Sequence, residues 1–567
     1  MQRMRQFALL LLPALLLFML PAEAEPPEAL IIGIYPQQAD TDDIIQFMGY
    51  FSDNDGDDLD YFYWNSSLDG TIHSGNETGE LTFQMAADRL SSGNHTITLQ
   101  VRTNASEWRE DATSWLDITE PEAQPLAAAL ILLIFIIAFV LILGEFVHRT
   151  TAAWMGAVAM LLVGKLTGTL DWCTDGECEG NLFAAIEFNV IGLLLGMMIF
   201  AAMLEISGFF EFIAIKATKL SKGDPWMLVV YLGTFTTLIS VVIDNVTAII
   251  LIAPITIKIC NKLEISAIPP LIAEAILSDT GGVATLVGDP PNVMIAASTG
   301  FTFNSFIEHL TPLTVLAWIA TMGYMRYYYR DWIETKPTHV VEVLAEDEWA
   351  VVRDRPMMNR TLAALALTIV MFSVHELIHL ELEISAIALG GAGFAIALSL
   401  PDLPDVVERV EWPALLFFAG LFIMVGGLEG VGHLTALASW IFDTFAENPL
   451  MLAVAVIWVS AIASAIIDNI PFAAAMIPVI HKLGELSEGD LNTAPLFWAL
   501  AMGCGFGGNA TPIGSSANVM TVSISERGGH AISTAEWMRV GLPVMMITCV
   551  VATIFMVVFY DSLYVNP

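Results

Sequence analysis

Charged residues are scarce in this chain of 567 residues, and basic ones are the scarcest. Asp, Glu, Lys and Arg make up 14% of the sequence against 56% hydrophobic residues, whereas a soluble domain carries about 25% charged residues. Most of the chain is therefore expected in lipid. Residues 25–124 hold twenty acidic residues, three Arg and no Lys, so the negative charge belongs partly to one segment. The absence of a basic stripe argues against a nucleic-acid partner.

The N-terminal segment 1–24 predicts export. Arg3 and Arg5 precede an apolar run at 7–20, and Ala22-Glu23-Ala24 offers small residues for cleavage, which is the order of a secretory signal peptide. An uncleaved signal anchor is the alternative, although the run is short for a membrane span. The next segment is therefore expected outside the cytoplasm.

Residues 25–124 predict a small extracytoplasmic β-sandwich. Short strand-like runs such as 44–51 and 95–102 are separated by turns rich in Asp, Asn, Gly and Ser, a spacing typical of an all-β module. The stretch FSDNDGDDLDYFYW followed by SSGNHTITLQV resembles polycystic-kidney-disease-type and related immunoglobulin-like ectodomains.

An acidic turn in this segment is a candidate calcium site. Asp53, Asp55 and Asp57 offer carboxylate oxygens, the donors that calcium prefers. Gly56 falls at the wrong place for an EF-hand loop, and acidic turns without a metal are common, so a plain turn stays as the alternative. Four sequons could also accept glycans; they begin at Asn65, Asn76, Asn94 and Asn104.

After Pro125 the composition predicts a polytopic α-helical membrane domain. Apolar runs long enough to cross the hydrocarbon core alternate with polar loops. With an exported N-terminal domain, His148 and Arg149 fall on the cytoplasmic side, as the positive-inside rule requires. A first half at 126–330 and a second half at 361–560 flank a cytoplasmic loop at 331–360. Predicted crossings include 126–146, 154–170, 184–206, 269–299, 311–325, 361–378 and 384–400.

The loop at 171–181 holds Cys173 and Cys178 on the expected outer, oxidising side of the membrane. A local disulfide between them is one interpretation. Two free thiols are the other, because spacing alone does not fix the geometry of the bond.

An internal repeat organises the membrane domain. EFNVIGLLLGMMIFAAMLEISG from Glu187 matches EWPALLFFAGLFIMVGGLEGVG from Glu411, and SVVIDNVTA matches SAIIDNIPF at the same spacing of 224 residues. GGVATLVGDPPNVM from Gly281 matches GGNATPIGSSANVM from Gly507 at a spacing of 226. Three matches in one order indicate two copies of one structural unit.

Counting crossings predicts that the two copies are inverted. The segment 227–262 is too long for one span and has polar residues at its middle, which favours a re-entrant hairpin. Five crossings then separate the copies, and an odd number turns the second one over. The second hairpin, at 450–483, should enter from outside, and ten crossings leave the C-terminus outside. Inverted repeats are typical of alternating-access transporters.

Two Asp-Asn pairs and two glycine-rich breaks form the predicted site. Asp and Asn at lipid depth are costly unless they line a polar cavity, and unwound backbone there exposes carbonyls and helix N-termini to ions. Structural hydrogen bonds and packing kinks are the alternatives. The candidate substrate- or ion-binding residues are Asp244, Asn245, Thr247, Asp279, Thr280, Gly281, Gly282, Thr285, Gly288, Asp289, Asn292, Asp468, Asn469, Gly507, Gly508, Asn509, Thr511, Gly514, Ser515, Ser516 and Asn518.

Asp279 and Asp289 lack acidic equivalents in the second copy, where Ser515 falls at the position of Asp289. This asymmetry makes them candidates for coupling to a proton or a cation. Sodium or a proton is the expected coupling ion, and no other cofactor is expected.

VIDNVTAIILIAPI and GGVATLVGDPPNVMI, repeated as IIDNIPFAAAMIPVI and GGNATPIGSSANVM, resemble the ion transporter superfamily with its citrate-transporter-like domain. The resemblance covers about 126–560 and is nearest the branch of the melanocyte P protein and arsenite permeases. It implies a scaffold domain and a moving, elevator-like transport domain, often in a homodimer. Family members move dicarboxylates, citrate, sulfate or arsenite, or exchange sodium for protons. The Asp-Asn tips here differ from the Ser-Asn-Thr tips of the dicarboxylate branch, which argues against a dicarboxylate.

The sequence therefore predicts a secondary active transporter of a small inorganic ion or anion in the plasma membrane, not an enzyme. Cation/proton antiport is favoured over transport of arsenite or another anion, because acidic tips would repel an anion. A channel shares the architecture but needs a continuous path. An intramembrane aspartyl protease would explain paired Asp residues but not the duplicated glycines. A receptor would rest on the ectodomain alone.

Overall fold

The structure is a computed structural model in which the chain forms two compact units, residues 1–125 and 126–567. The residues described are 28–40, 44–52, 59–75, 81–91, 93–103, 109–119, 125–144, 146–167, 169, 185–378, 382–445, 448–487 and 491–564. The predicted signal peptide at 1–24, the candidate calcium ligands Asp53, Asp55 and Asp57, and the cysteine pair Cys173 and Cys178 lie outside them.

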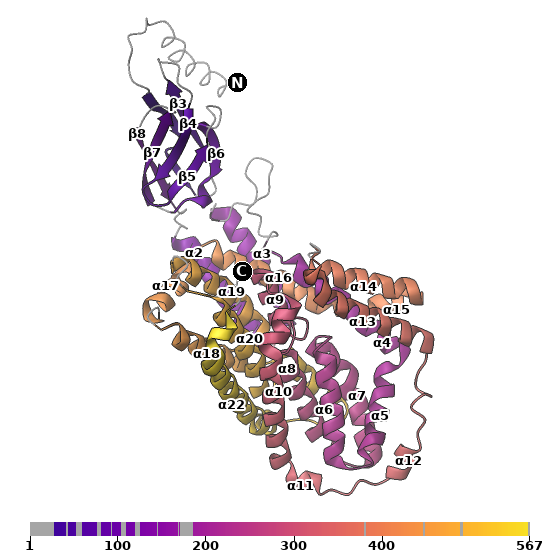
Figure 1. The fold of residues 1–567 in the computed structure, drawn as a ribbon. Helices are drawn as coiled ribbons and strands as arrows, with labels where there is room; N and C mark the ends of the chain where they lie inside the picture. The colour runs from indigo at the N-terminus through magenta and orange to yellow at the C-terminus, as the bar shows by residue number, and fades with distance from the viewer. Residues whose placement is uncertain are drawn as a thin grey trace, which may run out of the picture. The chain divides into compact units, whose positions relative to one another are not determined.

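The N-terminal unit consists of two β-sheets (Figure 1). One has three strands in the order β1-β3-β6, all antiparallel. The other has five in the order β2-β8-β7-β4-β5, with only β2 and β8 parallel. The strands are β1 Glu28–Tyr35, β2 Gln38–Asp40, β3 Ile44–Ser52, β4 Leu59–Ser66, β5 Gly70–Gly75, β6 Thr82–Ala86, β7 Gly93–Thr103 and β8 Arg109–Thr119.

Aromatic side chains join the two sheets. Phe47 of β3 lies edge-on to Trp64 of β4, with ring centroids 5.6 Å apart, and stacks on Phe83 of β6 at 4.7 Å. Phe47 and Trp64 are fully buried, so burial of their apolar surface stabilises the contact between the sheets. The predicted β-sandwich is confirmed.

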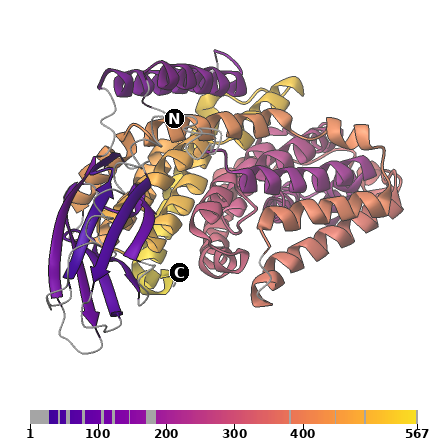
Figure 2. The ribbon, with the colours of Figure 1, turned by 90° about the horizontal axis from the view of Figure 1, so that it is seen from above.

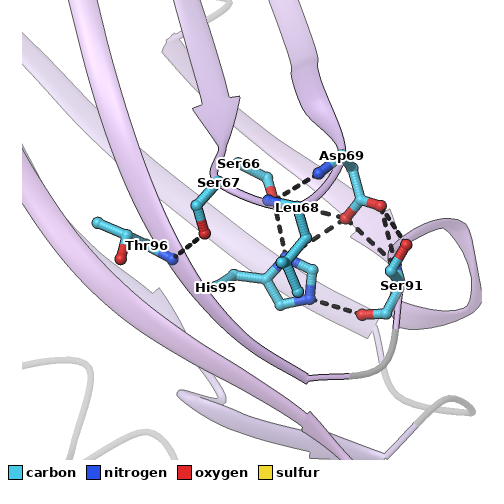
Figure 3. Close-up of polar contacts among 7 residues, drawn as sticks. All are labelled: Ser66, Ser67, Leu68, Asp69, Ser91, His95 and Thr96. Atoms are coloured by element: carbon cyan, nitrogen blue, oxygen red, sulfur yellow. Dashed lines mark hydrogen bonds and ion pairs between the residues drawn. The ribbon is translucent and has the colours of Figure 1, made fainter.

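A buried histidine ties the β4–β5 turn to β7 (Figure 3). His95 Nδ1 lies 2.7 Å from Ser66 Oγ, and its Nε2 lies 2.6 Å from the Ser91 carbonyl oxygen. The Ser66 hydroxyl also accepts the backbone N–H of Asp69 at 3.1 Å. With each polar atom of the ring partnered, the cluster holds the turn in place.

The second unit is helical, and by length and composition seven helices among its described residues could cross a membrane. The helices, most of which are labelled in Figure 1, are α2 Pro125–Leu143, α3 Arg149–Thr167, α4 Phe188–Ser207, α5 Phe209–Ser221, α6 Pro225–Ser240, α7 Asn245–Leu263, α8 Ile268–Gly282, α9 Pro290–Thr299, α10 Phe303–Tyr328, α11 Arg330–Ile333, α12 Val340–Leu344, α13 Arg355–Leu377, α14 Ile384–Ser399, α15 Leu403–Glu408, α16 Trp412–Glu429, α17 His433–Phe445, α18 Pro449–Ile466, α19 Asn469–Leu486, α20 Ala494–Gly507, η3 Gly508–Ala510, α21 Ser516–Arg527 and α22 Thr534–Phe559.

Both predicted hairpins are pairs of helices with short tips. The first is α6 and α7, and the second is α18 and α19. Their starts match: Asp224 caps α6 by accepting the N–H of Met227 at 2.9 Å, and Asn448 caps α18 by accepting that of Met451 at 3.0 Å. A proline follows each cap at the first helical position, where its missing N–H costs nothing. The two copies therefore share the same local structure at the start of each hairpin.

The helices that carry the first residues of each copy pack crosswise. α4 lies against α14, and α16 lies against α3 (Figures 1 and 2). Gly196 of α4 meets Ala388, and the matching Gly420 of α16 meets Ala153. Small residues at both contacts let the backbones approach closely. A helix of each copy therefore packs against a helix of the other copy.

The glycine-rich segments break two helices at the predicted places. α8 ends at Gly282 and α9 begins at Pro290, while α20 ends at Gly507 and α21 begins at Ser516. A Cβ on Gly288 would stand 2.5 Å from the Gly282 carbonyl oxygen, and one on Gly514 would stand 2.6 Å from that of Gly508. Both breaks therefore require glycine for backbone packing.

We predict that Gly288→Ala and Gly514→Ala each destabilise the folded protein by about 1–3 kcal/mol, since the new Cβ overlaps backbone that has little room to move. Unfolding in mixed detergent micelles measures the difference. Gly390→Ala is the matched control, because no atom of the described residues lies within 4 Å of its Cβ position on α14 and alanine favours a helix. Equal stability of all three variants would contradict this account of the breaks.

Candidate functional site

The site begins at the tips of the two hairpins. Asp244 precedes α7 and accepts the backbone N–H of Thr247 at 2.9 Å and its hydroxyl at 2.6 Å. Asp468 precedes α19 in the matching position. Asn245 and Asn469 are the first residues of these helices, and both are buried. Each tip thus presents a carboxylate and an amide at a helix N-terminus, where the helix dipole favours negative charge.

The amides of both tips meet on one carboxylate, that of Asp289. Asn469 Nδ2 donates to Asp289 Oδ1 at 3.1 Å and to Oδ2 at 3.0 Å. Asn245 Nδ2 lies 3.4 Å from Asp289 Oδ1. Asp289 is 1% exposed, so these donors replace the water that its carboxylate would otherwise bind. Residues from both copies therefore converge at one point.

Asp279 is the second carboxylate at this point. It accepts hydrogen bonds at Oδ1 from Asn245 Nδ2 and from the Ser515 hydroxyl, both at 2.9 Å. Its Oδ2 is buried and has no partner among the described residues. A buried oxygen of this kind is available to a ligand.

Each of the two acidic residues contacts the residue that stands at the repeat position of the other. Asp279 contacts Ser515, which stands at the repeat position of Asp289. The symmetric contact joins Asp289 to Gly505, the repeat position of Asp279, with Asp289 Oδ2 3.4 Å from where a Gly505 Cβ would lie. The first copy supplies both carboxylates, and the second supplies a hydroxyl and a glycine, whose Cβ position lies 2.3 Å from Val283 Cγ2.

Four other predicted residues brace the breaks. Thr285 donates its hydroxyl to the Val241 carbonyl at 2.5 Å, and Thr511 donates to that of Ala465 at 2.6 Å. The Asn292 amide donates to the carbonyls of Gly282, Val283 and Thr285, and the Asn518 amide donates to those of Gly508 and Thr511. The threonines fix each break against the hairpin of its own copy, and the asparagines fix the backbone within the break.

The remaining predicted residues lie around the same point. The Asn509 amide donates to the Thr280 hydroxyl at 3.3 Å across the two copies, and Asn509 Oδ1 is buried without a partner among the described residues. Gly281 lies against Thr237 of the first hairpin, and Gly507 lies against Ala461 of the second. Among the described residues no group of three or more His, Cys, Asp or Glu is arranged to hold a metal ion.

Arg149 is not among the predicted site residues, yet its guanidinium contacts Asp468. Arg149 Nη1 lies 3.3 Å from Asp468 Oδ2, and both side chains bond the hydroxyl of Ser516. Arg149 begins α3, which is distant from the hairpin in the sequence, and the sequence predicts for it only a place at the cytoplasmic end of a span. One sequence signal points to this contact: the second copy has Pro471 where the first has Thr247, so that position offers Asp468 neither an N–H nor a hydroxyl.

A small cavity opens beside the tips. It measures about 340 Å³ including its open mouth, and both hairpins, both breaks and α16 line it. Glu411, at the start of α16, was also absent from the predicted site. The polar residues in its wall are Arg149, Asp244, Glu411 and Ser516.

Comparison with known proteins places this arrangement in a family. The sequence model of a family described as citrate transporter matches residues 131–503. The chain belongs to the citrate transporter family. This confirms the predicted membership of the ion transporter superfamily.

Relatives of the citrate transporter family share most of the membrane domain. An uncharacterized transporter of Mycobacterium bovis is 38% identical over 423 residues, 75% of this chain and 96% of that protein. The P protein of Homo sapiens is 33% identical over 499 residues, 74% of this chain and 58% of that protein. The crystal structure of the Alcanivorax borkumensis YdaH transporter aligns with a TM-score of 0.48 and 14% identity, covering 73% of this chain and 98% of that one.

Membership in the citrate transporter family makes the chain an integral membrane transporter of a small molecule. The polar residues buried between its two hairpins are therefore candidates for contact with the transported molecule. Charged and amide groups at membrane depth typically mark a substrate or ion pathway.

We predict that Asn469→Ala lowers the stability of this transporter by about 1–3 kcal/mol, because Asp289 loses two hydrogen bonds inside the protein. Unfolding in mixed micelles measures it. Asn261→Ala is the control, since Asn261 is exposed on α7 and bonds only the side chain of His530 among the described contacts; its effect should stay within about 0.5 kcal/mol. If both variants unfold alike, Asn469 does not hold the hairpin to the break.

Proposed function

We propose that this protein is a secondary active transporter that moves a small inorganic ion by an elevator-like, alternating-access mechanism coupled to sodium or protons. Cation/proton antiport is the favoured activity. The observation that carries the proposal is the meeting of both Asp-Asn tips on Asp289, because two inverted copies sharing one buried polar point can open it to either side in turn.

The charge of the site supports a cation or a proton as the transported or coupling ion. Four carboxylates surround the tips, those of Asp244, Asp279, Asp289 and Asp468, and Arg149 is the one cation bonded to any of them among the described residues. In a region of low dielectric such an excess of negative charge repels an anion and attracts a cation. Buried oxygens of Asp279, Asp468 and Asn509 that have no hydrogen-bond partner among the described residues also support a bound cation.

Transport of arsenite or another anion is the second candidate. Four helix N-termini point to the site, those of α7, α9, α19 and α21, and Arg149 adds a guanidinium. Helix N-termini and arginine are the usual anion-binding groups of proteins. Asp residues already occupy three of these four N-termini, at Asp244, Asp289 and Asp468, which favours the cation instead.

We also propose an orientation of the transporter in the membrane. The positive-inside rule supports a cytoplasmic side that carries the loop 331–360 and the first hairpin. The N-terminal β-sandwich and the C-terminus then lie outside the plasma membrane, and the second hairpin enters from there. The crosswise contacts of α3, α4, α14 and α16 support a scaffold against which the hairpins and broken helices move, and two such scaffolds would form the homodimer.

The proposal is tested by a flux screen with the purified protein in liposomes. Sodium, protons, arsenite, chloride and carboxylates are each offered against an imposed gradient. An imposed sodium gradient is expected to drive a change of internal pH at the turnover of a carrier. Flux of arsenite alone would support the second candidate. Currents far above a carrier's turnover would identify a channel instead.

We predict that Asp244→Asn and Asp468→Asn each reduce this flux to background while the protein keeps its elution volume and melting temperature, because a neutral amide cannot exchange a cation for a proton. Asp402→Asn is the control, since Asp402 is exposed before α15 and makes no side-chain cap. Normal flux in both tip variants would remove these carboxylates from the mechanism.

A further inference from the structure

Asp244 and Asp468 occupy one position of the repeat but have different partners. Asp244 is bonded within its own helix, by the N–H and hydroxyl of Thr247. Asp468 has no side-chain cap on its own helix, because Pro471 stands in the place of Thr247 and offers neither an N–H nor a hydroxyl. The side chains bonded to the Asp468 carboxylate therefore belong to other elements.

Those partners come from two different elements. Asp468 Oδ2 accepts from the Ser516 hydroxyl of α21 and from the Arg149 guanidinium of α3 at 3.3 Å. The guanidinium also lies over the ring of Phe417 of α16, 5.6 Å from its centroid. Arg149 is thus held by the helices that pack crosswise, whereas Ser516 lies on the broken helix of the same copy as the hairpin.

The helix that corresponds to α3 in the second copy is α14. Ala153 of α3 meets Gly420, and Ala388 of α14 meets the matching Gly196. The two alanines are 235 residues apart, which sets the register between α3 and α14. By this register the counterpart of Arg149 is Ile384, a residue without charge.

A hydrogen bond checks the same register. Thr150 donates its hydroxyl to the Pro413 carbonyl at 2.7 Å, and Ser385 donates to Asn189 Oδ1 at 2.7 Å. Ser385 is 235 residues after Thr150, and Asn189 is 224 before Pro413. Two independent contacts therefore agree that the cation beside Asp468 has no equivalent beside Asp244.

This difference matters when the two copies exchange environments, which is the basis of alternating access in inverted repeats. In the exchanged state Asp468 would face Glu187, the counterpart of the Glu411 that now shares a cavity with Asp244. The charged groups that now face Asp468 are Arg149 and the carboxyls of Asp279 and Asp289. Without Arg149 all its charged neighbours are acidic.

We propose that Arg149 is a conformation-dependent counter-ion: it neutralises the Asp468 carboxylate in the state described here and leaves it when the second hairpin moves. This inference rests on the proposed transport function and specifies its coupling. In the moved state a sodium ion or a proton takes the place of the guanidinium on Asp468. On return Arg149 displaces that cation toward the other side of the membrane. Arg149 is thus a positioning residue that drives release.

The test is cation binding by the full-length purified protein in detergent, read as the rise of its melting temperature with sodium concentration. Choline replaces sodium at constant ionic strength, and a parallel series varies pH without sodium, so that the two cations are distinguished. A ligand that binds the folded state raises its melting temperature in a saturable way. Arg149→Gln should lower the half-saturating concentration of sodium or protons at least tenfold, because the competing guanidinium is gone, and slow the release of cation from liposomes.

Two further variants separate this role from a structural one. Arg149→Lys keeps a positive charge, so its half-saturating concentration should lie nearer to that of the native protein than to that of Arg149→Gln, and it keeps the test decisive if Arg149→Gln fails to fold. In the double variant Arg149→Gln with Asp468→Asn, the gain in cation affinity should vanish. Arg353 lies on the loop before α13 and is bonded to Glu211 of α5. Arg353→Gln should therefore bind sodium or protons as the native protein does.

The outcomes of the inference and of the proposed function are distinguishable. If the native protein binds sodium or protons and Arg149→Gln binds them with unchanged affinity, the counter-ion role is wrong although transport stands. An Arg149→Lys variant that shifts as far as Arg149→Gln would also overturn it, since charge would not be the cause. If the native protein shows neither cation-dependent melting nor flux, the proposed function itself fails.

Discussion

The structure of the membrane domain depends on satisfying the carboxylate of Asp289, which is buried between the two hairpins. Its donors are the amides of Asn245 and Asn469, one from each copy of the repeat. A buried carboxylate without such donors would carry the full cost of desolvation. The hairpin tips are therefore held against the broken helices, and the glycines of each break allow the backbone to come close enough for these bonds to form.

The two copies of the repeat share their caps, breaks and helix contacts, whereas several residues of the candidate site differ between the copies. Caps, breaks and crosswise contacts recur in both copies with similar geometry. The unmatched positions gather at one place: Asp279 faces Ser515, Asp289 faces Gly505, and Arg149 reaches Asp468. A symmetric pair of sites would bind the same ligand equally in both orientations. In the proposed mechanism, this asymmetry allows binding on one side and release on the other to differ in energy.

Much of this arrangement could be predicted from the sequence because duplication makes it visible. The 224- and 226-residue spacings located both hairpins and both breaks, and polar residues within apolar segments pointed to Asp244, Asn245, Asp468 and Asn469. The contacts that join distant segments could not be predicted. Nothing local places Arg149 beside Asp468, since the approach of α3 to the second hairpin is a product of tertiary packing. The bracing roles of Asn292 and Asn518 likewise follow from backbone carbonyls that a sequence does not display.

Both hairpin tips line one shared pocket. Val246 and Ile470, at matching positions just after the two Asp-Asn pairs, line the same cavity. Cysteines at these two positions, treated in native membranes with a short bifunctional thiol reagent, should form an intramolecular cross-link that mass spectrometry of the peptides detects. Labelling of both cysteines without any cross-link between them would contradict the account.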